Sequence, residues 1–195
     1  TIAGECLAEG DNPIDIMQHQ LINLQFPSPY SSNQNVKIDP NIKIKPVKFI
    51  LELLKDSRIE YLTEVETIIP IVYGRDESKK SFCIEKILLL RKLNDGSIRK
   101  KDELNNLKNI IDDKCDLFTI RTLNSTVGAR LKDLCDVANT FVNYLSGALL
   151  ITREKENNRY KYFFNDNSLN NINKILDESK KYIAYNENSD QESFQ

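Results

Sequence analysis

The sequence has few of the residues on which metal sites and nucleophilic catalysis depend. It contains one histidine, His19, and four cysteines that form no C-x-x-C pair, Cys6, Cys83, Cys115 and Cys135. Zinc sites and Ser-His-Asp triads both need such residues at suitable spacings. No GxGxxG or GxxxxGK[ST] phosphate loop occurs either. These absences argue against the common zinc, dinucleotide and P-loop classes, and the thiols are most simply reduced core residues.

The sequence also lacks a long apolar run and a strong excess of one charge. No stretch approaches the roughly 20 apolar residues of a membrane span, and no charged-then-apolar leader opens the chain. We therefore expect a cytoplasmic protein that does not contact a membrane. Its formal net charge of −2 argues against a nonspecific nucleic-acid coat, although a local basic face would still permit DNA recognition. Because TIAGECLAEG begins without methionine, we expect a fragment of a longer protein.

Apolar periodicity predicts several helices in the first two thirds of the chain. One begins at Pro13 and a second at Pro46, since proline is favoured in the first turn of a helix. Between them, residues 27–45 are rich in Ser, Asn and Pro and predict a loop. Two further helices are predicted, from about residue 79 to 93 and from 102 to 112.

A capping box lies between the second and third of these helices. Thr63 and Glu66 have the T-x-x-E spacing at which each side chain binds the backbone N–H of the other residue. The box predicts the start of another helix, which Pro70 should kink or shorten. Two helices joined by a short turn fit a helix-turn-helix scaffold, but the same pattern occurs in many helical bundles.

The last third of the chain predicts a helix followed by a two-stranded ribbon. In DLCDVANTFVNYLSG, apolar residues recur every three or four positions, as in an amphipathic helix. ALLITRE and RYKYFFN follow as strands joined by the polar turn KENN. This order is the sequence form of a winged helix, which commonly places its helix in the DNA major groove and its ribbon on the backbone. Such a domain can also serve only for packing or dimerisation.

Basic and amide side chains accompany these elements. On one side of the fold they would neutralise phosphates and make binding salt-dependent; the alternative is a set of solvated helix faces. An Asn amide can pair with adenine through two hydrogen bonds. The candidate DNA-binding residues are Lys79, Lys80, Arg99, Lys100, Lys101, Arg121, Asn124, Arg130, Lys132, Asn139, Asn143, Arg153, Arg159 and Lys161. Asp133 and Asp136 would repel phosphate unless they accept from cytosine amino groups, so an earlier helix is the alternative reader of bases.

The order of motifs also carries a family resemblance. In sequence the motifs are T-x-x-G-E-x-L, QLINLQFPSP, IKPVKFILELL, YLTEVE, KSFCIEKILLLRKLN and LCDVANTFVNYLSGALLITREKENNRYKYFF. Together they resemble the DNA-recognition region of type IIS restriction endonucleases, most closely the AlwI-type family and related nicking endonucleases. In those enzymes, linked winged helices recognise an asymmetric site and a separate PD-(D/E)xK nuclease domain cuts outside it. The resemblance implies double-stranded DNA as partner and Mg²⁺ for the parent nuclease.

Catalysis within this chain has little support from the sequence. A PD-(D/E)xK site clusters carboxylates around Mg²⁺ and adds a lysine that assists the attacking water. Glu77-Ser78-Lys79 and Asp112-Asp113-Lys114 are acidic-x-Lys triplets, but neither lies on an apolar strand and no Pro-Asp pair precedes them. We therefore expect no catalytic residue and no cofactor in this segment, and a nuclease domain or subunit elsewhere in the parent protein.

Taken together, these patterns predict a mainly α fold with short β wings, arranged as tandem winged-helix-like subdomains. A helical first recognition subdomain is expected over residues 1–75, a winged-helix second one over 76–183, and an acidic, disordered tail over 184–195. The expected function is sequence-specific recognition of double-stranded DNA as the binding part of a type II, IIS-like restriction endonuclease. The alternative is a winged-helix transcriptional regulator, which should dimerise and favour palindromes, or a protein-interaction module.

Overall fold

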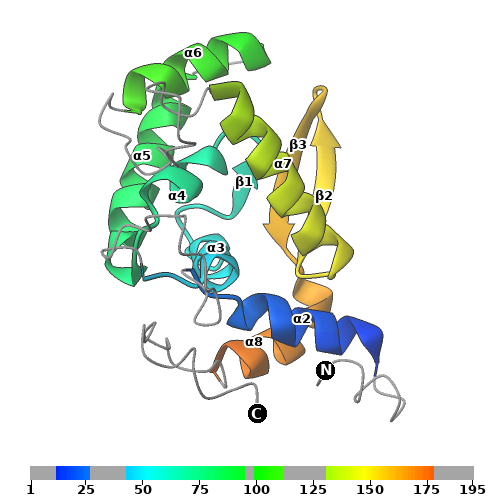
Figure 1. Ribbon diagram of the computed structural model, residues 1–195. Helices are drawn as coiled ribbons and strands as arrows, with labels where there is room; N and C mark the ends of the chain where they lie inside the picture. The colour runs from blue at the N-terminus through cyan, green and yellow to red at the C-terminus, as the bar shows by residue number, and fades with distance from the viewer. Residues whose placement is uncertain (1–11, 27–42, 95–98, 112–130, 178–195) are drawn as a thin grey trace.

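The computed structural model describes residues 12–26, 43–94, 99–111 and 131–177, which form a mainly helical fold with a small antiparallel sheet (Figure 1). This confirms the predicted mainly α class. The helices are α2 (Pro13–Asn23), α3 (Pro46–Leu54), α4 (Ile68–Tyr73), α5 (Lys80–Leu93), α6 (Lys100–Ile110), α7 (Leu131–Gly147) and α8 (Leu169–Asp177), with short 3-10 turns η1 (Glu77–Lys79) and η3 (Asp166–Ser168). The predicted tail, and the predicted loop up to residue 42, lie outside the described residues.

The described sheet joins segments that are far apart in the chain. Its strands are β1 (Tyr61–Thr63), β2 (Ile151–Glu156) and β3 (Arg159–Phe164), in the order β1-β3-β2 and antiparallel throughout. The β2–β3 hairpin turns at Asn157 and Asn158, whose φ angles are 48° and 61°. Asparagine tolerates this left-handed region, and two such residues suit a tight hairpin turn. β1 precedes the predicted subdomain boundary at residue 75 and the hairpin follows it, so one sheet contains strands from both predicted subdomains. The division into two subdomains stays a prediction.

A hydrophobic core fastens α7 to the rest of the fold. Leu134, Ala138, Val142 and Leu145 are buried along one side of the helix, at the spacing of three or four that brings residues onto one helical face. They contribute to the same core cluster as residues of α3, α4 and α5. Since fully burying a leucine or valine stabilises a fold by about 1.5–3 kcal/mol, this stripe fixes which face of α7 points to solvent.

The predicted capping box is present, but it precedes α4 without starting it. The Thr63 N–H donates to Glu66 Oε2 at 2.9 Å, and the Glu66 N–H donates to Thr63 Oγ1 at 3.2 Å. Residues 64–67 then form turns, and the helix begins only at Ile68. The box therefore ties the end of β1 to the approach of α4.

Arg91 of α5 extends this junction. Its Nε and Nη2 donate to the two carboxylate oxygens of Glu66 at 2.7 and 3.1 Å, and its Nη1 and Nη2 donate to the carbonyl oxygens of Ile59 and Tyr61 at 3.1 and 2.6 Å. Burial opposes the charge of the guanidinium, but the hydrogen bonds and charge of Glu66 outweigh it, so the pKa of Arg91 is raised. The ion pair holds α5 against the edge of β1.

Candidate nucleic-acid interface

The solvent face of α7 is the exposed side of a helix whose other side is in the core. Among the described side chains of α7, those exposed recur at helical spacing and are Asp133, Asp136, Val137, Thr140, Asn143 and Tyr144. We call this set the α7 stripe. Val137 is 46% and Tyr144 64% exposed, high values for such side chains. From Val137 to Gly147 the helix carries no charged residue, so hydrogen-bonding and apolar groups dominate this face.

The two predicted base readers on α7 have different environments. Asn143 is exposed within the α7 stripe, whereas Asn139 is half-buried beside it. Between them, the Thr140 hydroxyl donates to the Asp136 carbonyl oxygen at 2.9 Å. The hydroxyl proton is thereby committed to the helix, which leaves the methyl group and the oxygen lone pairs of Thr140 for other partners.

The hairpin beside α7 carries the predicted basic ribbon. Arg153 and Lys155 are exposed on β2, and both lie over the ring of Tyr160, with 4.6 Å from Arg153 Cζ and 5.9 Å from Lys155 Nζ to its centroid. Lys161 on β3 is paired with Glu156 and lies 4.5 Å from the centroid of Tyr61. Lys161 donates a hydrogen bond to the Glu156 carboxylate, and this bond is the main reason that the pKa of Lys161 is raised.

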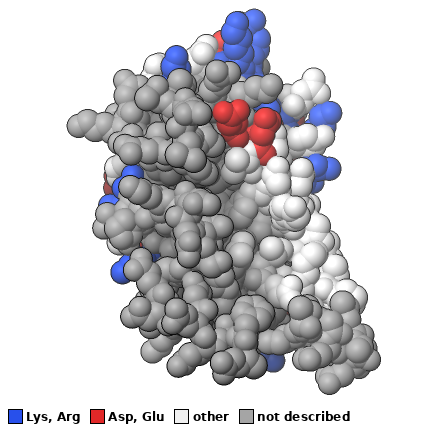
Figure 2. Space-filling view, viewed as in Figure 1, with Lys and Arg blue, Asp and Glu red and all other residues white. Residues whose placement is uncertain are grey.

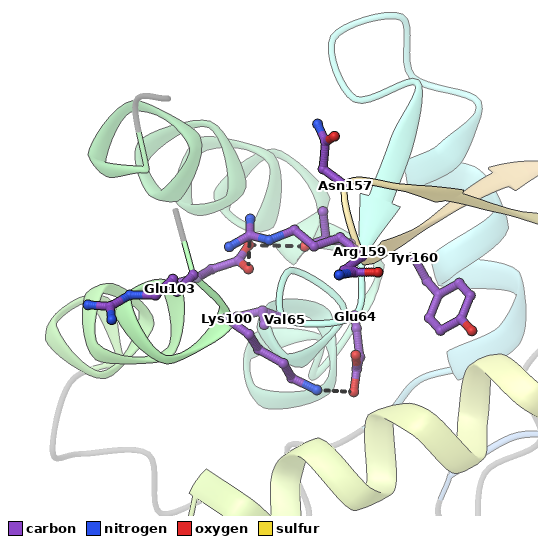
Figure 3. Close-up of a pocket in the computed structure, with 10 residues that line it drawn as sticks. Glu64, Val65, Lys100, Glu103, Asn157, Arg159 and Tyr160 are labelled. Carbon is purple, nitrogen blue, oxygen red and sulfur yellow. Dashed lines mark hydrogen bonds and ion pairs between the residues drawn. The ribbon is translucent and has the colours of Figure 1, made fainter. Parts of the chain in front are cut away.

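A cavity of about 370 Å³ lies between the turn of this hairpin and the first turn of α6. It brings together three of the predicted basic residues, Arg99, Lys100 and Arg159, with Asn157 and Asn158 from the turn (Figure 3). Residues that are distant in the sequence thus form one basic rim at the tip of the ribbon.

Carboxylates hold two of these cations in place. Arg159 Nη1 lies 3.2 Å from Glu103 Oε2, and the Thr63 hydroxyl donates to Glu103 Oε1 at 3.3 Å. Lys100 Nζ lies 2.6 Å from Glu64 Oε1 (Figure 3). Burial raises the pKa of Glu103, and the nearby charge of Arg159 limits the rise. The rim therefore alternates cations with acidic partners.

The remaining predicted residues divide into three groups. Lys101 is exposed on α6, and Arg99, 85% exposed at its side chain, pairs with Asp102 at 3.1 Å. Lys79 and Lys80 lie at the start of α5, at the far end of that helix from α6, and so away from the rim (Figure 1). Arg121, Asn124 and Arg130 lie outside the described residues, as does the side chain of Lys132.

Charge on the face that α7 shares with the hairpin is segregated. In the view of Figure 2, acidic side chains lie over the start of α7 and uncharged ones follow the helix. Basic side chains gather above, around α6, and to one side, along the hairpin. The α7 stripe is therefore flanked by cations on two sides.

The described residues do not fit a Mg²⁺-dependent nuclease centre. They contain no group of three or more His, Cys, Asp or Glu side chains that could hold a metal ion. Glu77, of the first acidic-x-Lys triplet, is exposed on η1 and lies 3.8 Å from Lys48 Nζ. The second triplet, residues 112–114, is outside the described residues.

Several residues of this surface were not found from the sequence. Val137, Thr140 and Tyr144 of the α7 stripe could have been, because they occupy the positions opposite the apolar stripe of the same helix. Glu64 and Glu103 offered no local signal. Glu64 pairs with Lys100, which is 36 residues further along the chain, and Glu103 pairs with Arg159, which is 56 residues further along.

A family comparison relates the chain to type II restriction endonucleases. Residues 6–127, more than half of the 195, match the model described as the N-terminal domain of the type II restriction endonuclease HgaI. The chain belongs to this family. The match ends before α7, so that helix and the β2–β3 hairpin lie beyond the matched residues. A search of curated proteins finds no match. Within the described residues, no helix is both long and apolar enough to cross a membrane.

Proposed function

We propose that this chain recognises a specific sequence in double-stranded DNA, as the binding part of a type II restriction endonuclease of the IIS kind. The observation that carries the proposal is the α7 stripe. After Asp136 this helix face has hydrogen-bonding groups and no charged residue, and the basic residues of the hairpin and α6 flank it. Family membership supports DNA as the substrate of the parent enzyme. We also propose that, within the type II restriction endonucleases, the parent enzyme is related to the AlwI-type enzymes.

A winged-helix interpretation is supported by the connection of the elements. In a winged helix, a short strand between the first two helices pairs with a hairpin that follows the recognition helix. Here β1 lies between α3 and α4 and pairs with β3, while α7 contacts α4 and leads directly into the hairpin. With α5 and α6 as an insertion between α4 and α7, the elements follow that order, and α7 takes the position of the recognition helix.

The dimensions and chemistry of this surface suit a duplex. A helix about 10–12 Å across fits the major groove, which is about 12 Å wide. With α7 in the groove, Asn143 would hydrogen-bond an adenine, and Asp133 and Asp136 would accept from the amino groups of cytosine. Arg153 and Lys155 on one side and Lys100 and Lys101 on the other would contact phosphates and fix the register.

Cleavage belongs to another part of the parent enzyme in this proposal. A nuclease domain or subunit would bind Mg²⁺ and hydrolyse the phosphodiester outside the recognised sequence, in the cytoplasm. This segment would contribute no catalytic residue and no cofactor.

Selection of bound duplexes from a random DNA pool, at low and moderate salt, tests the proposal. The two salt concentrations separate sequence recognition from purely electrostatic binding. We expect enrichment of one short asymmetric sequence at both. An enriched palindrome would instead indicate a dimeric regulator, and no enrichment at either salt would leave a protein-interaction module.

A further inference from the structure

We propose that Val137 and Thr140 bind the C5-methyl group of a thymine in the major groove, within about three base pairs of the adenine contacted by Asn143. This inference rests on the proposed function and adds to it a chemical class of base and the residues that select it. Only thymine among the four DNA bases presents a methyl group in the major groove, where apolar and threonine side chains contact it.

The first support is the environment of Val137. It is 46% exposed at the outer face of α7, although one turn later Phe141 is half-buried and packed against the core. Its apolar surface therefore faces solvent in the chain alone. Contact with a methyl group would remove that surface from water, which is favourable in proportion to its area.

Thr140 lies three residues further along the same stripe, so the two side chains are neighbours on the helix surface. Its hydroxyl donates to the Asp136 carbonyl oxygen, with 2.9 Å between the two oxygens. The side chain is consequently less suited to donate to a base and better suited to offer its methyl group. Val137 and Thr140 together form a small apolar patch within a polar stripe.

Charge complementarity identifies DNA as the occupant of this patch. The hairpin bears the exposed Arg153 and Lys155, and α6 bears the exposed Lys100 and Lys101. Basic side chains gather over both of these elements around the face that carries the patch (Figure 2). An apolar surface of a protein partner would have no need of cations on two sides, whereas the two phosphate backbones that border a major groove do.

The helix also sets the distance between the two recognised bases. Val137 and Asn143 are six residues apart, which corresponds to about 9 Å along an α-helix. Base pairs are stacked about 3.4 Å apart along each strand. A helix lying along the groove therefore spans no more than about three base-pair steps between these residues, and fewer if it is tilted.

Uracil scanning of the selected DNA site tests the inference. Each thymine of the enriched duplex is replaced in turn by uracil, which lacks only the methyl group, and the Kd of the whole chain is measured for each duplex. Loss of one buried methyl contact should weaken binding about fourfold. We expect this effect at a thymine no more than about three base pairs from the adenine whose preference Asn143→Ala relaxes.

For the Val137→Ala variant, the Kd for the uracil duplex divided by the Kd for the thymine duplex should fall below about two, since most of the apolar contact is gone. Leu89→Ala, which truncates a 43% exposed side chain on α5, is the matched control and should retain the full ratio. An enriched site at which every uracil is tolerated, or a Val137→Ala variant with the full ratio, would overturn the inference while leaving DNA recognition intact. A pool from which nothing is enriched would remove the proposed function and this inference with it.

Discussion

Arg159 is both a candidate phosphate ligand and a structural cation. Its guanidinium lies 3.2 Å from Glu103, a carboxylate whose side chain is only 4% exposed. Removing one partner of such a pair leaves the other buried without compensation, which costs more than the pair itself contributes. Loss of DNA binding on changing Arg159 would therefore not distinguish a lost phosphate contact from a weakened fold.

We expect Arg159→Ala to lower the free energy of unfolding by about 1–3 kcal/mol at pH 7. Adding Glu103→Gln should recover much of the loss, because a neutral amide costs less to bury than a carboxylate. Urea denaturation of both variants and the unchanged chain measures this. Equal stability of Arg159→Ala and the unchanged chain would show that the ion pair contributes nothing.

The same variant should have a distinctive pH dependence. Burial raises the pKa of Glu103 above its ordinary value, and without Arg159 the rise should be larger. A carboxyl group with a raised pKa in the folded state favours folding below its unfolded pKa, and this contribution is lost as the pH rises through the folded pKa. Arg159→Ala should therefore approach the stability of the unchanged chain as the pH falls from 7 toward 4. Urea midpoints across this range would contradict the assignment if the deficit stayed constant.

Arg153 is the better test of phosphate contact, because it is exposed and its described neighbour is the Tyr160 ring. Arg153→Ala should weaken binding to all duplexes similarly and reduce the slope of log K against log salt by about 0.9. Lys174→Ala, which removes an exposed lysine of α8, at the end of the fold opposite the hairpin turn and α6 (Figure 1), is the control and should change neither. An unchanged slope for Arg153→Ala would remove the hairpin from the interface.

At the scale of the element, α7 has two faces with opposite sensitivities. Leu145 is fully buried and Tyr144, next to it in the chain, is 64% exposed. We expect Leu145→Ala to cost about 2–5 kcal/mol of stability through the lost contacts and the cavity left behind. Tyr144→Ala should change stability by less than about 0.5 kcal/mol. Thermal denaturation that ranks the two variants in the reverse order would mean that α7 is rotated about its axis.

The exposed face of α7 should separate its two asparagines in binding experiments. Asn143→Ala should relax the preference at one base position by about 1–3 kcal/mol, the discrimination of one bidentate amide–adenine pair. Asn139→Ala should relax it less, because Asn139 is half-buried beside the stripe. Repeating the selection with each variant measures this. A larger effect for Asn139 would place another face of α7 in the groove.

At the scale of the whole molecule, the sheet joins elements from both halves of the chain. β1 pairs with β3, and α5 and α6 extend from the same core (Figure 1). The candidate interface uses α6, α7 and the hairpin, so its geometry depends on long-range pairing. In the proposed binding mode, a single copy would present α7 to the duplex with phosphate contacts on two sides, an arrangement that suits an asymmetric site.

We therefore expect one chain to bind one selected duplex. Analytical ultracentrifugation of the complex should give a mass equal to one 22.5 kDa chain plus the DNA. Two chains on a palindromic duplex would favour the regulator interpretation, because dimeric DNA-binding proteins match two half-sites by their own symmetry.

Local features of the sequence were enough to predict much of the architecture. The apolar spacing of α7, the alternation of β3, the polar turn of the hairpin and the Thr63–Glu66 capping box all depend on residues close together in the chain. The structure confirms a mainly helical fold, a helix-then-hairpin order and the reciprocal hydrogen bonds of the box. Membership of a type II restriction-enzyme family is confirmed as well, whereas the relation to AlwI-type enzymes stays a prediction.

By itself, then, the sequence determined most of the helices, the two strands of the hairpin and which side of α7 is apolar, because these follow from periodicity over a few residues; strand β1 left no such pattern. Only the tertiary structure decided that β1 pairs with β3, that Arg159 and Lys100 meet at one rim while Lys79 and Lys80 lie elsewhere, and that Glu103 and Glu64 are their partners. Those outcomes depend on how the core brings distant segments together, and pairwise contacts between residues 36 to more than 100 positions apart leave no periodic trace in the sequence.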